Sequence, residues 1–185
     1  MKQIVLVRHS EVDIKYDESI TSSQFGKWIE KYNSSKIKIP QLIDSELKSL
    51  FDSDSLVICS ELVRAKESVA IFGKEIYESN SIFNEFEMPY IKSDFLKLKP
   101  KYWLLIYRVL WFFGFSNNCE SYKEAKDRVV VAVDRLVELS SEHNRVILVN
   151  SGFINRFIYS ELLRRGWSGS KRISSTHLGY GILCR

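Results

Sequence analysis

The chain has 185 residues, of which 45% are hydrophobic and 13% are aromatic, so it can bury a substantial core and does not have the composition of a disordered protein. Its formal charge is only +4, and the basic residues are scattered among acidic ones, so we expect no nucleic-acid-binding stripe. We expect one domain that spans residues 1–185.

The three cysteines, Cys59, Cys119 and Cys184, are widely spaced, and none belongs to a Cys-x-x-Cys motif. This pattern is typical of reduced, structural thiols in a cytoplasmic protein. No signal-peptide pattern opens the sequence, since Met1 and Lys2 lead directly into a strand. We therefore expect a cytoplasmic protein.

Short apolar runs predict four buried strands, at residues 3–8, 55–60, 145–150 and 180–184. A further short strand is predicted at 81–83. The runs are continuous rather than alternating, which is typical of parallel strands that are covered on both faces.

Helical spacing of apolar residues predicts helices between these strands, and residues 84–100 are expected to be irregular. The predicted helices are 21–33, 45–51, 60–71, 101–113, 120–141 and, opened by Gly152, 154–165. Thr21, Ser22 and Ser23 are the candidate N-caps of the first helix, and Ser60 is the expected N-cap of the third. This alternation predicts an α/β fold, a three-layer α/β/α sandwich around a mostly parallel sheet.

The most hydrophobic stretch, Tyr102 to Phe115, is too short to span a membrane and has Arg108 in its middle. We expect a helix whose apolar face is buried in the domain. An amphipathic helix at a membrane interface is the alternative.

Polar residues follow three of the predicted strands, and these strand ends are expected to converge. The residues are Arg8 and His9 after the first strand, Ser60 and Arg64 after the second, and Asn150, Ser151 and Gly152 after the third. Two arginines, a histidine and a helix N-terminus make an anion pocket that suits phosphoryl transfer. Glu85 and Glu87 lie in the irregular segment and are candidates for the acid that protonates a leaving group.

The strand 4–9, Ile-Val-Leu-Val-Arg-His, resembles the opening of the histidine phosphatase superfamily, the phosphoglycerate-mutase-like proteins. There the motif is usually Arg-His-Gly, and its histidine becomes phosphorylated. Residues 57–70 are similar to the family's second block, usually Ser-x-x-x-Arg-Ala-x-x-Thr-Ala, which implies that Arg64 is the second phosphate-binding arginine.

Two further blocks match in order, so the resemblance covers nearly the whole chain. Glu85 falls where many members carry the catalytic acid, which favours it over Glu87. Glu120-Ser121 followed by Arg128 resembles the block before the last long helix. The family implies a phosphoglycerate-mutase-like fold and a mechanism without metal or cofactor.

One position departs from the family pattern. The third strand usually ends in a histidine that is the second catalytic imidazole, and here Ser151 takes its place. Serine donates one hydrogen bond but carries no charge. The loss of one transition-state donor costs about 2.7–4 kcal/mol, or roughly a hundredfold to a thousandfold in rate.

Two other residues are expected to border the pocket. Ser10 follows His9 directly, and His177 lies in the loop that enters the last strand. His177 is a candidate replacement imidazole or substrate contact, although a strand-end histidine bonded to backbone is the more common case. No cluster of ligand residues has metal spacing, and no Gly-x-x-x-x-Gly-Lys loop is present, so we expect no metal and no nucleoside triphosphate chemistry.

Two functions fit these observations. The first is a metal-independent phosphomonoesterase in which His9 attacks phosphorus, Arg8 and Arg64 hold the oxygens, Glu85 protonates the leaving group and Ser151 contributes a weak hydrogen bond. The second is a catalytically impaired relative that binds a phosphorylated ligand. In both cases the expected partner is a phosphorylated small molecule or a phosphoprotein, without nucleic acid and without a membrane span.

Overall fold

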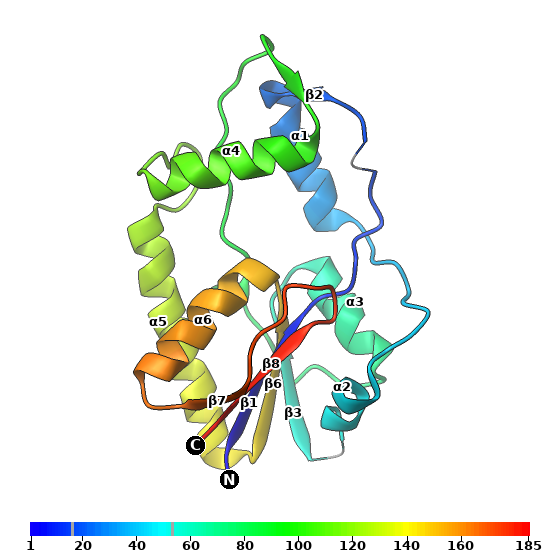
Figure 1. Ribbon diagram of the computed structural model, residues 1–185, viewed down its shortest axis with the longest axis vertical. Coiled ribbons are helices and arrows are strands. Elements are labelled where there is room, and N and C mark those ends of the chain that lie inside the picture. The colour runs from blue at the N-terminus through cyan, green and yellow to red at the C-terminus, as the bar shows by residue number, and fades with distance from the viewer. Residues whose placement is uncertain (16, 53) are drawn as a thin grey trace.

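The computed structural model describes residues 1–15, 17–52 and 54–185 (Figure 1). Its strands are β1 (Gln3–Arg8), β2 (Ile20–Thr21), β3 (Ser55–Cys59), β4 (Glu78–Ser79), β5 (Lys97–Leu98), β6 (Arg145–Asn150), β7 (Ser168–Lys171) and β8 (Tyr180–Cys184). Its helices are α1 (Ser22–Ser34), α2 (Ser45–Leu50), α3 (Val63–Ile71), the short 3-10 helix η1 (Ser81–Phe83), α4 (Pro100–Phe112), α5 (Tyr122–Glu142) and α6 (Gly152–Arg164).

Six strands form the main sheet in the order β4-β3-β6-β1-β8-β7. The strands from β4 to β1 are parallel, whereas β8 runs antiparallel to both β1 and β7. In the centre, β1 and β6 pair from Gln3 with Arg145 to Arg8 with Asn150. The carboxyl ends of β1, β3 and β6 therefore meet at one edge of the sheet.

Helices cover both faces of this sheet, with α5 and α6 on one side and α2 and α3 on the other (Figure 1). Alternate residues of β1 enter different cores: Ile4 and Leu6 pack toward α5 and α6, and Val5 and Val7 pack toward α2 and α3. All four are fully buried. The expected three-layer α/β/α sandwich with a mostly parallel sheet is confirmed.

A second group of elements lies beyond the carboxyl edge of the sheet (Figure 1). It consists of α1, α4 and the small antiparallel sheet of β2 and β5, and we call it the cap. The cap has its own apolar cluster around Phe25, Trp103 and Tyr107. The indole nitrogen of Trp103 donates to the carbonyl of Ile20 at 2.8 Å, which ties α4 to β2.

Several local predictions were wrong for identifiable reasons. Residues 81–83 form η1 rather than a strand, because the Asn80 side chain accepts from the Ile82 N–H and turns the chain. Ser60 does not cap α3: its N–H still bonds to β6, at Val149 O, and the helix begins only after Leu62. The expected Thr21 cap is confirmed, with a reciprocal bond to Gln24.

The apolar helix α4 departs from expectation in one respect. Trp103, Tyr107 and Trp111 are buried as expected, but the opposite face of the helix carries exposed apolar side chains. Within the described ranges, no helix is both long enough and apolar enough to cross a bilayer.

Candidate active site

Three chain segments leave the sheet side by side at its carboxyl edge. The N–H of His9 donates to Asn150 O at 2.8 Å, and the N–H of Ser60 donates to Val149 O at 3.2 Å. These bonds continue the parallel registers by one residue. They place the segments that follow β1, β3 and β6 next to one another below the cap.

A cavity of about 840 Å³ lies between this edge and the cap. It brings together six of the residues singled out in the sequence: Arg8, His9, Arg64, Glu85, Ser151 and His177. Apolar side chains from the cap and α6 also line the cavity, among them Trp28, Tyr32, Leu104 and Phe153. Arg108 and Arg156 line it as well, and neither was expected at the site: in the sequence Arg108 stands out only as the charge within an apolar stretch, and Arg156 belongs to an ordinary helical pattern.

His9 is buried, with 2% of its surface exposed. Its Nδ1 lies 2.6 Å from the carbonyl oxygen of Ser10. Because a carbonyl only accepts, Nδ1 must carry the proton, and in the neutral ring the lone pair is then on Nε2. Burial, followed by the charge of Arg64, holds the pKa of His9 well below its ordinary value of 6.5. The ring is therefore neutral at pH 7.

Arg64 enters the cavity from the first turn of α3 and is 2% exposed. Its Nε and Nη2 donate to Ser151 Oγ at 3.4 and 3.3 Å, and its Nη1 donates to Asn33 Oδ1 at 2.9 Å. The guanidinium also lies over the Tyr32 ring, 4.8 Å from its centroid. Asn33 and Tyr32 belong to α1, so the cap orients this arginine.

Arg8 lies on the other side of His9. Its Nη1 donates to Ser175 O, and its Nη2 is 3.2 Å from His177 Nε2, while its buried Nε has no hydrogen-bond partner among the described residues. A Cβ on Gly152 would come within 2.9 Å of Arg8 Cδ. A residue with a side chain at position 152, where α6 begins, would therefore clash with the side chain of Arg8.

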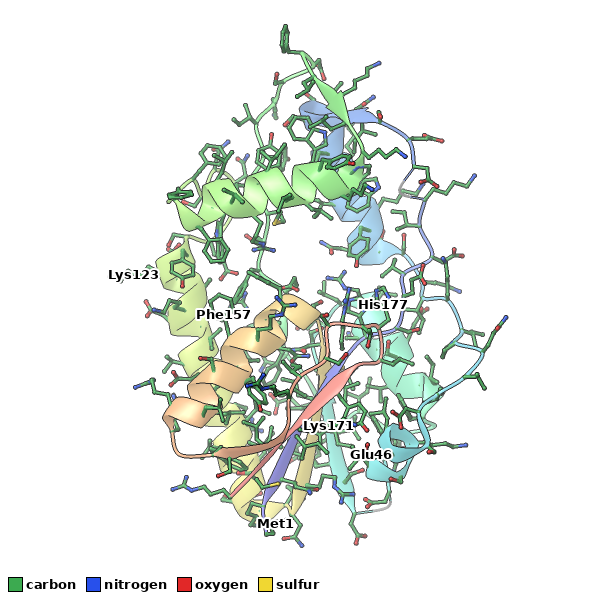
Figure 2. All side chains as sticks on the ribbon, in the orientation of Figure 1. Met1, Glu46, Lys123, Phe157, Lys171 and His177 are labelled. Atoms are coloured by element: carbon green, nitrogen blue, oxygen red, sulfur yellow. The ribbon has the colours of Figure 1, made fainter. Side chains whose placement is uncertain are left out.

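His177 lies in the loop between β7 and β8 (Figure 2). Its ring centroid is 5.9 Å from that of His9. Burial, followed by the charge of Arg8, lowers the pKa of His177 from its ordinary value. The cavity therefore contains a second imidazole, although not at position 151.

Glu85 lies at the N-terminus of α6. Its Oε1 accepts from the N–H groups of Phe86 and Ile154 at 2.9 and 3.1 Å, and its Oε2 accepts from Phe153 N–H at 3.2 Å. These bonds hold the carboxylate at the start of the helix, where the macrodipole favours an anion.

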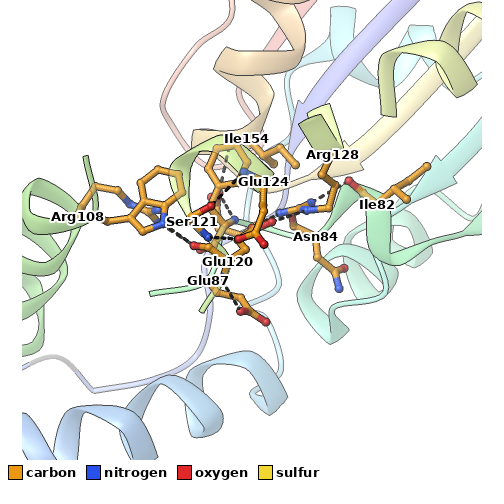
Figure 3. A network of polar contacts seen from close by, with 12 residues as sticks. Ile82, Asn84, Glu87, Arg108, Glu120, Ser121, Glu124, Arg128 and Ile154 are labelled. Atoms are coloured by element: carbon orange, nitrogen blue, oxygen red, sulfur yellow. Dashed lines mark hydrogen bonds and ion pairs between the residues drawn. The ribbon is translucent and has the colours of Figure 1, made fainter. Parts of the chain in front are cut away.

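The segment that carries Glu85 is anchored by Arg128 of α5 (Figure 3). Arg128 Nη1 donates to the carbonyl groups of Ile82 and Asn84 at 2.9 and 2.8 Å. Its Nε and Nη2 bond both carboxylate oxygens of Glu120, at 2.9 and 2.5 Å. Glu87 faces this network and accepts from the Glu120 N–H at 3.2 Å, so it serves the anchor while Glu85 holds α6.

Ser10 does not line the main cavity. Its Oγ donates to Lys38 O at 3.0 Å, and its N–H donates to Ser68 Oγ at 2.8 Å. It borders a neighbouring cavity of about 560 Å³, which His177 also lines. Ser10 therefore contributes to the main cavity only through its backbone carbonyl, which accepts the hydrogen bond from His9 Nδ1.

Comparison with known proteins identifies the family. A family model described as histidine phosphatase superfamily (branch 1) matches residues 4–183. The chain belongs to the histidine phosphatase superfamily. No curated protein matches the chain.

Several solved structures, two of them of proteins named as phosphatases, share this fold. The open reading frame Rv3214 product from Mycobacterium tuberculosis is 17% identical, with a TM-score of 0.62 over 98% of this chain and 90% of that one. Mycobacterial glucosyl-3-phosphoglycerate phosphatase Rv2419c is 16% identical, with a TM-score of 0.55 over 88% of this chain and 80% of its own. The alpha-ribazole phosphatase from Shigella flexneri is 17% identical, with a TM-score of 0.50 over 88% and 78%.

In the part of the chain that the structure describes, no three His, Cys, Asp or Glu side chains gather closely enough to hold a metal ion. The charges that face the cavity near His9 are instead those of arginines. What this arrangement offers chemically is a neutral imidazole nucleophile between two guanidinium groups.

Proposed function

We propose that this chain is a metal-independent phosphomonoester hydrolase that forms a phosphohistidine on His9. The observation that carries the proposal is the His9 imidazole: Ser10 holds its Nδ1–H, which leaves the Nε2 lone pair to attack in a cavity that also contains Arg8 and Arg64. Its lowered pKa keeps the ring in the nucleophilic form at neutral pH.

The reaction has two steps. Nε2 of His9 bonds to phosphorus while the bond from phosphorus to the leaving oxygen breaks, and Arg8 and Arg64 neutralise the non-bridging oxygens. Glu85, after it has taken up a proton from solvent, gives that proton to the leaving oxygen. Water then attacks the phosphohistidine and gives a proton to Glu85, while the bond from phosphorus to Nε2 breaks, which frees His9 and releases phosphate.

The role of Glu85 requires a local change. Its two oxygens accept three backbone hydrogen bonds, so the carboxyl group must exchange at least one of them for the leaving oxygen. Phe153 N–H, at 3.2 Å, is the longest of the three and is the first candidate for exchange.

Ser151 weakens this enzyme relative to one with a charged donor at the same place. Its Oγ already accepts from Arg64, so its own hydroxyl proton is the one donor it can offer to a phosphate oxygen. His177 is the group that compensates, because its ring lies beside His9 and Arg8. A phosphate dianion beside it would favour the charged imidazolium, which is a donor at both nitrogens.

The substrate class that fits is a phosphorylated small molecule with an apolar part. The cavity is large enough for such a molecule, and the apolar side chains of Trp28, Leu104 and Phe153 line it. Phosphatases of small molecules are also among the proteins with this fold. A phosphoprotein side chain is the other partner that the chemistry permits. We further propose that the protein acts in the cytoplasm and needs no cofactor.

The test is turnover of p-nitrophenyl phosphate in EDTA, together with trapping of phosphohistidine by an alkaline quench. Wild type should turn over and carry acid-labile phosphate on His9, and His9→Ala should lose both. His143→Ala is the matched control, since this histidine does not line the cavity. Undiminished turnover in His9→Ala, or phosphate on another residue, would refute the mechanism.

Position 151 favours a second function, which is binding of a phosphorylated ligand without turnover. Arg8 and Arg64 keep the positive field, whereas the charged donor is missing. If wild type binds phosphate by calorimetry but hydrolyses no aryl phosphate above background, the binding function replaces the enzymatic one.

A further inference from the structure

The outward face of α4 is apolar along its length. Six side chains at helical spacing form this face, which we call the outer stripe: Tyr102, Leu105, Ile106, Val109, Phe112 and Phe113. Their exposed fractions lie between 37% and 87%. Isolated exposed apolar residues are ordinary, but a continuous patch of this kind marks an interaction surface.

The opposite face of the same helix is already occupied. Trp103, Tyr107 and Trp111 are at most 7% exposed and pack in the core of the protein. A helix that is apolar all round is expected to be covered on every side. Among the described residues, packing within this chain therefore covers one face of α4 and leaves most of the outer stripe exposed.

Lysines gather at the amino-terminal end of the outer stripe. Residues 91–103 contain four basic side chains, Lys92, Lys97, Lys99 and Lys101, and one acidic side chain, Asp94. At the first turn of α4, Lys101 Nζ lies 5.0 Å from the centroid of the Tyr102 ring. Beyond the other end, Phe112 contacts Tyr122, and Lys126 Nζ lies 5.7 Å from that ring, with the acidic Glu124 and Asp127 close to it in the sequence. The excess of positive charge therefore lies at the amino-terminal end of the apolar patch.

We propose that the outer stripe docks on the surface of an anionic lipid bilayer. Apolar and aromatic side chains enter the boundary between headgroups and acyl chains, and the flanking lysines bind anionic headgroups. The helix lies in the plane of the interface and does not cross the bilayer.

Charge favours a bilayer over a second copy of this chain. A symmetric dimer through the outer stripe would bring two lysine-rich segments together, and like charges at an interface oppose association. The segment before α4 adds further exposed apolar side chains, with Phe95 at 98% and Leu96 at 48%. Exposed apolar side chains that are interspersed with lysines suit the headgroup region of a bilayer better than a rigid pocket on a protein.

Docking would occur on a wall of the catalytic cavity, because Leu104 and Arg108 of the same helix line that cavity. The proposal rests on the outer surface alone and does not depend on the proposed hydrolase activity. Its failure and the failure of the phosphatase assay are therefore separate results.

The test is co-sedimentation with vesicles of phosphatidylglycerol mixed with phosphatidylcholine, and with vesicles of phosphatidylcholine alone. Wild type should bind the mixed vesicles and bind the neutral ones at least about tenfold less. Leu105→Glu should weaken binding to mixed vesicles at least about tenfold. Leu163→Glu is the matched control: this leucine is 43% exposed on α6, outside the outer stripe, and its variant should bind as wild type does.

A triple variant, Lys97→Gln with Lys99→Gln and Lys101→Gln, tests the contribution of the charges separately. Its binding to the mixed vesicles should also be at least about tenfold weaker than that of the wild type. Circular dichroism of each variant establishes that α4 is still folded. Absence of binding to mixed vesicles, or equal binding of the wild type and Leu105→Glu, would overturn the proposal. A lipid-free dimer that Leu105→Glu dissociates would overturn it in favour of self-association.

Discussion

Ser151 sets the strength of the site. Its Oγ accepts two contacts from Arg64, of 3.4 and 3.3 Å, and only 3% of the residue is exposed. The hydroxyl thus helps to hold an arginine but brings no charge of its own. At this position a charged imidazole would face the phosphoryl group that His9 attacks in the proposed mechanism.

We expect Ser151→His to raise turnover of an aryl phosphate by about one to three orders of magnitude, because it restores a charged donor to the transition state. The measurement is kcat/KM for p-nitrophenyl phosphate. The gain must disappear in a His9→Ala background, which lacks the nucleophile.

His177 provides the control for this interpretation. If it already supplies the second imidazole, His177→Ala should abolish a substantial wild-type activity, and Ser151→His should add little in the presence of His177. If neither variant changes turnover and wild type shows only background hydrolysis, the catalytic proposal fails.

The titration of His9 gives a second prediction. Its pKa is lowered first by burial and then by Arg64, so its ring should stay neutral as the pH falls through 6.5. Arg64→Gln should raise the pKa, but not to the ordinary value, because burial remains. Side-chain NMR of the imidazole measures the pKa of His9 in the wild type and in Arg64→Gln, with Arg164→Gln as a distant control. A wild-type pKa at or above 6.5 would contradict the structure.

The same shift has a consequence for stability. In the unfolded chain the ring binds its proton near pH 6.5, whereas the folded protein binds it only at lower pH. The unfolded state therefore takes up more protons as the pH falls below 6.5, and the contribution of His9 to stability declines in that window.

The sequence identified most of the site residues but not what orients them. Arg8, His9 and Arg64 could be predicted from strand ends and motif order, since local chemistry carries that signal. Asn33 and Tyr32 could not, because their contact with Arg64 depends on how α1 packs against α3. Nothing in the spacing of α1 distinguishes a residue that faces a guanidinium from one that faces water.

Among the elements, the segment from η1 to Glu85 depends most on a single side chain. Arg128 holds two of its carbonyl groups and pairs with Glu120, and the two side chains are 20% and 18% exposed. Removal of one partner from such a pair leaves a partly buried charge. This anchor fixes the position of Glu85 relative to α6.

We expect Arg128→Met to lower the free energy of unfolding by about 3 kcal/mol. It should also lower kcat more than it raises KM, because Glu85 is displaced while the arginines of the phosphate site remain. Urea unfolding and steady-state kinetics measure the two effects. Arg164→Met, which removes an exposed arginine whose partner Glu161 keeps its ion pair with Arg165, should lower the free energy of unfolding by less than about 1 kcal/mol. Equal effects of the two variants would refute the anchoring role.

The long elements could be predicted because their apolar patterns are local. The four main strands and the six α-helices all occur close to their expected positions. The strands that were missed have no such pattern. β2 and β5 are two residues each and exist through mutual pairing, β4 is two residues that pair with β3, and β7 is an edge strand of sequence Ser-Gly-Ser-Lys. Tertiary contact creates these strands, so a single sequence does not reveal them.

At the scale of the whole molecule, α4 connects two apolar cores. Its Trp103 and Tyr107 belong to the cap cluster, and its Trp111 belongs to the cluster under α5 and α6, where it stacks on Phe86 with centroids 5.4 Å apart. The cavity lies between these cores. The expectation of one domain over residues 1–185 stays a prediction, which a single unfolding transition would support.

A ligand in this cavity contacts the sheet edge and the cap together, so binding should stabilise the whole molecule. Orthovanadate in EDTA is a suitable probe, because it resembles a phosphoryl group and the arginines supply the charge that it needs. At a concentration a hundred times its Kd it should add about 2.7 kcal/mol. For a chain of this size that corresponds to a rise in Tm of about 5–10 °C. The double variant Arg8→Gln with Arg64→Gln should show no rise, while Arg164→Gln, which changes an arginine outside the cavity, should keep it. A rise that survives in the double variant would place the anion elsewhere on the protein, and no rise in wild type would remove the case for a phosphate site between the cap and the sheet.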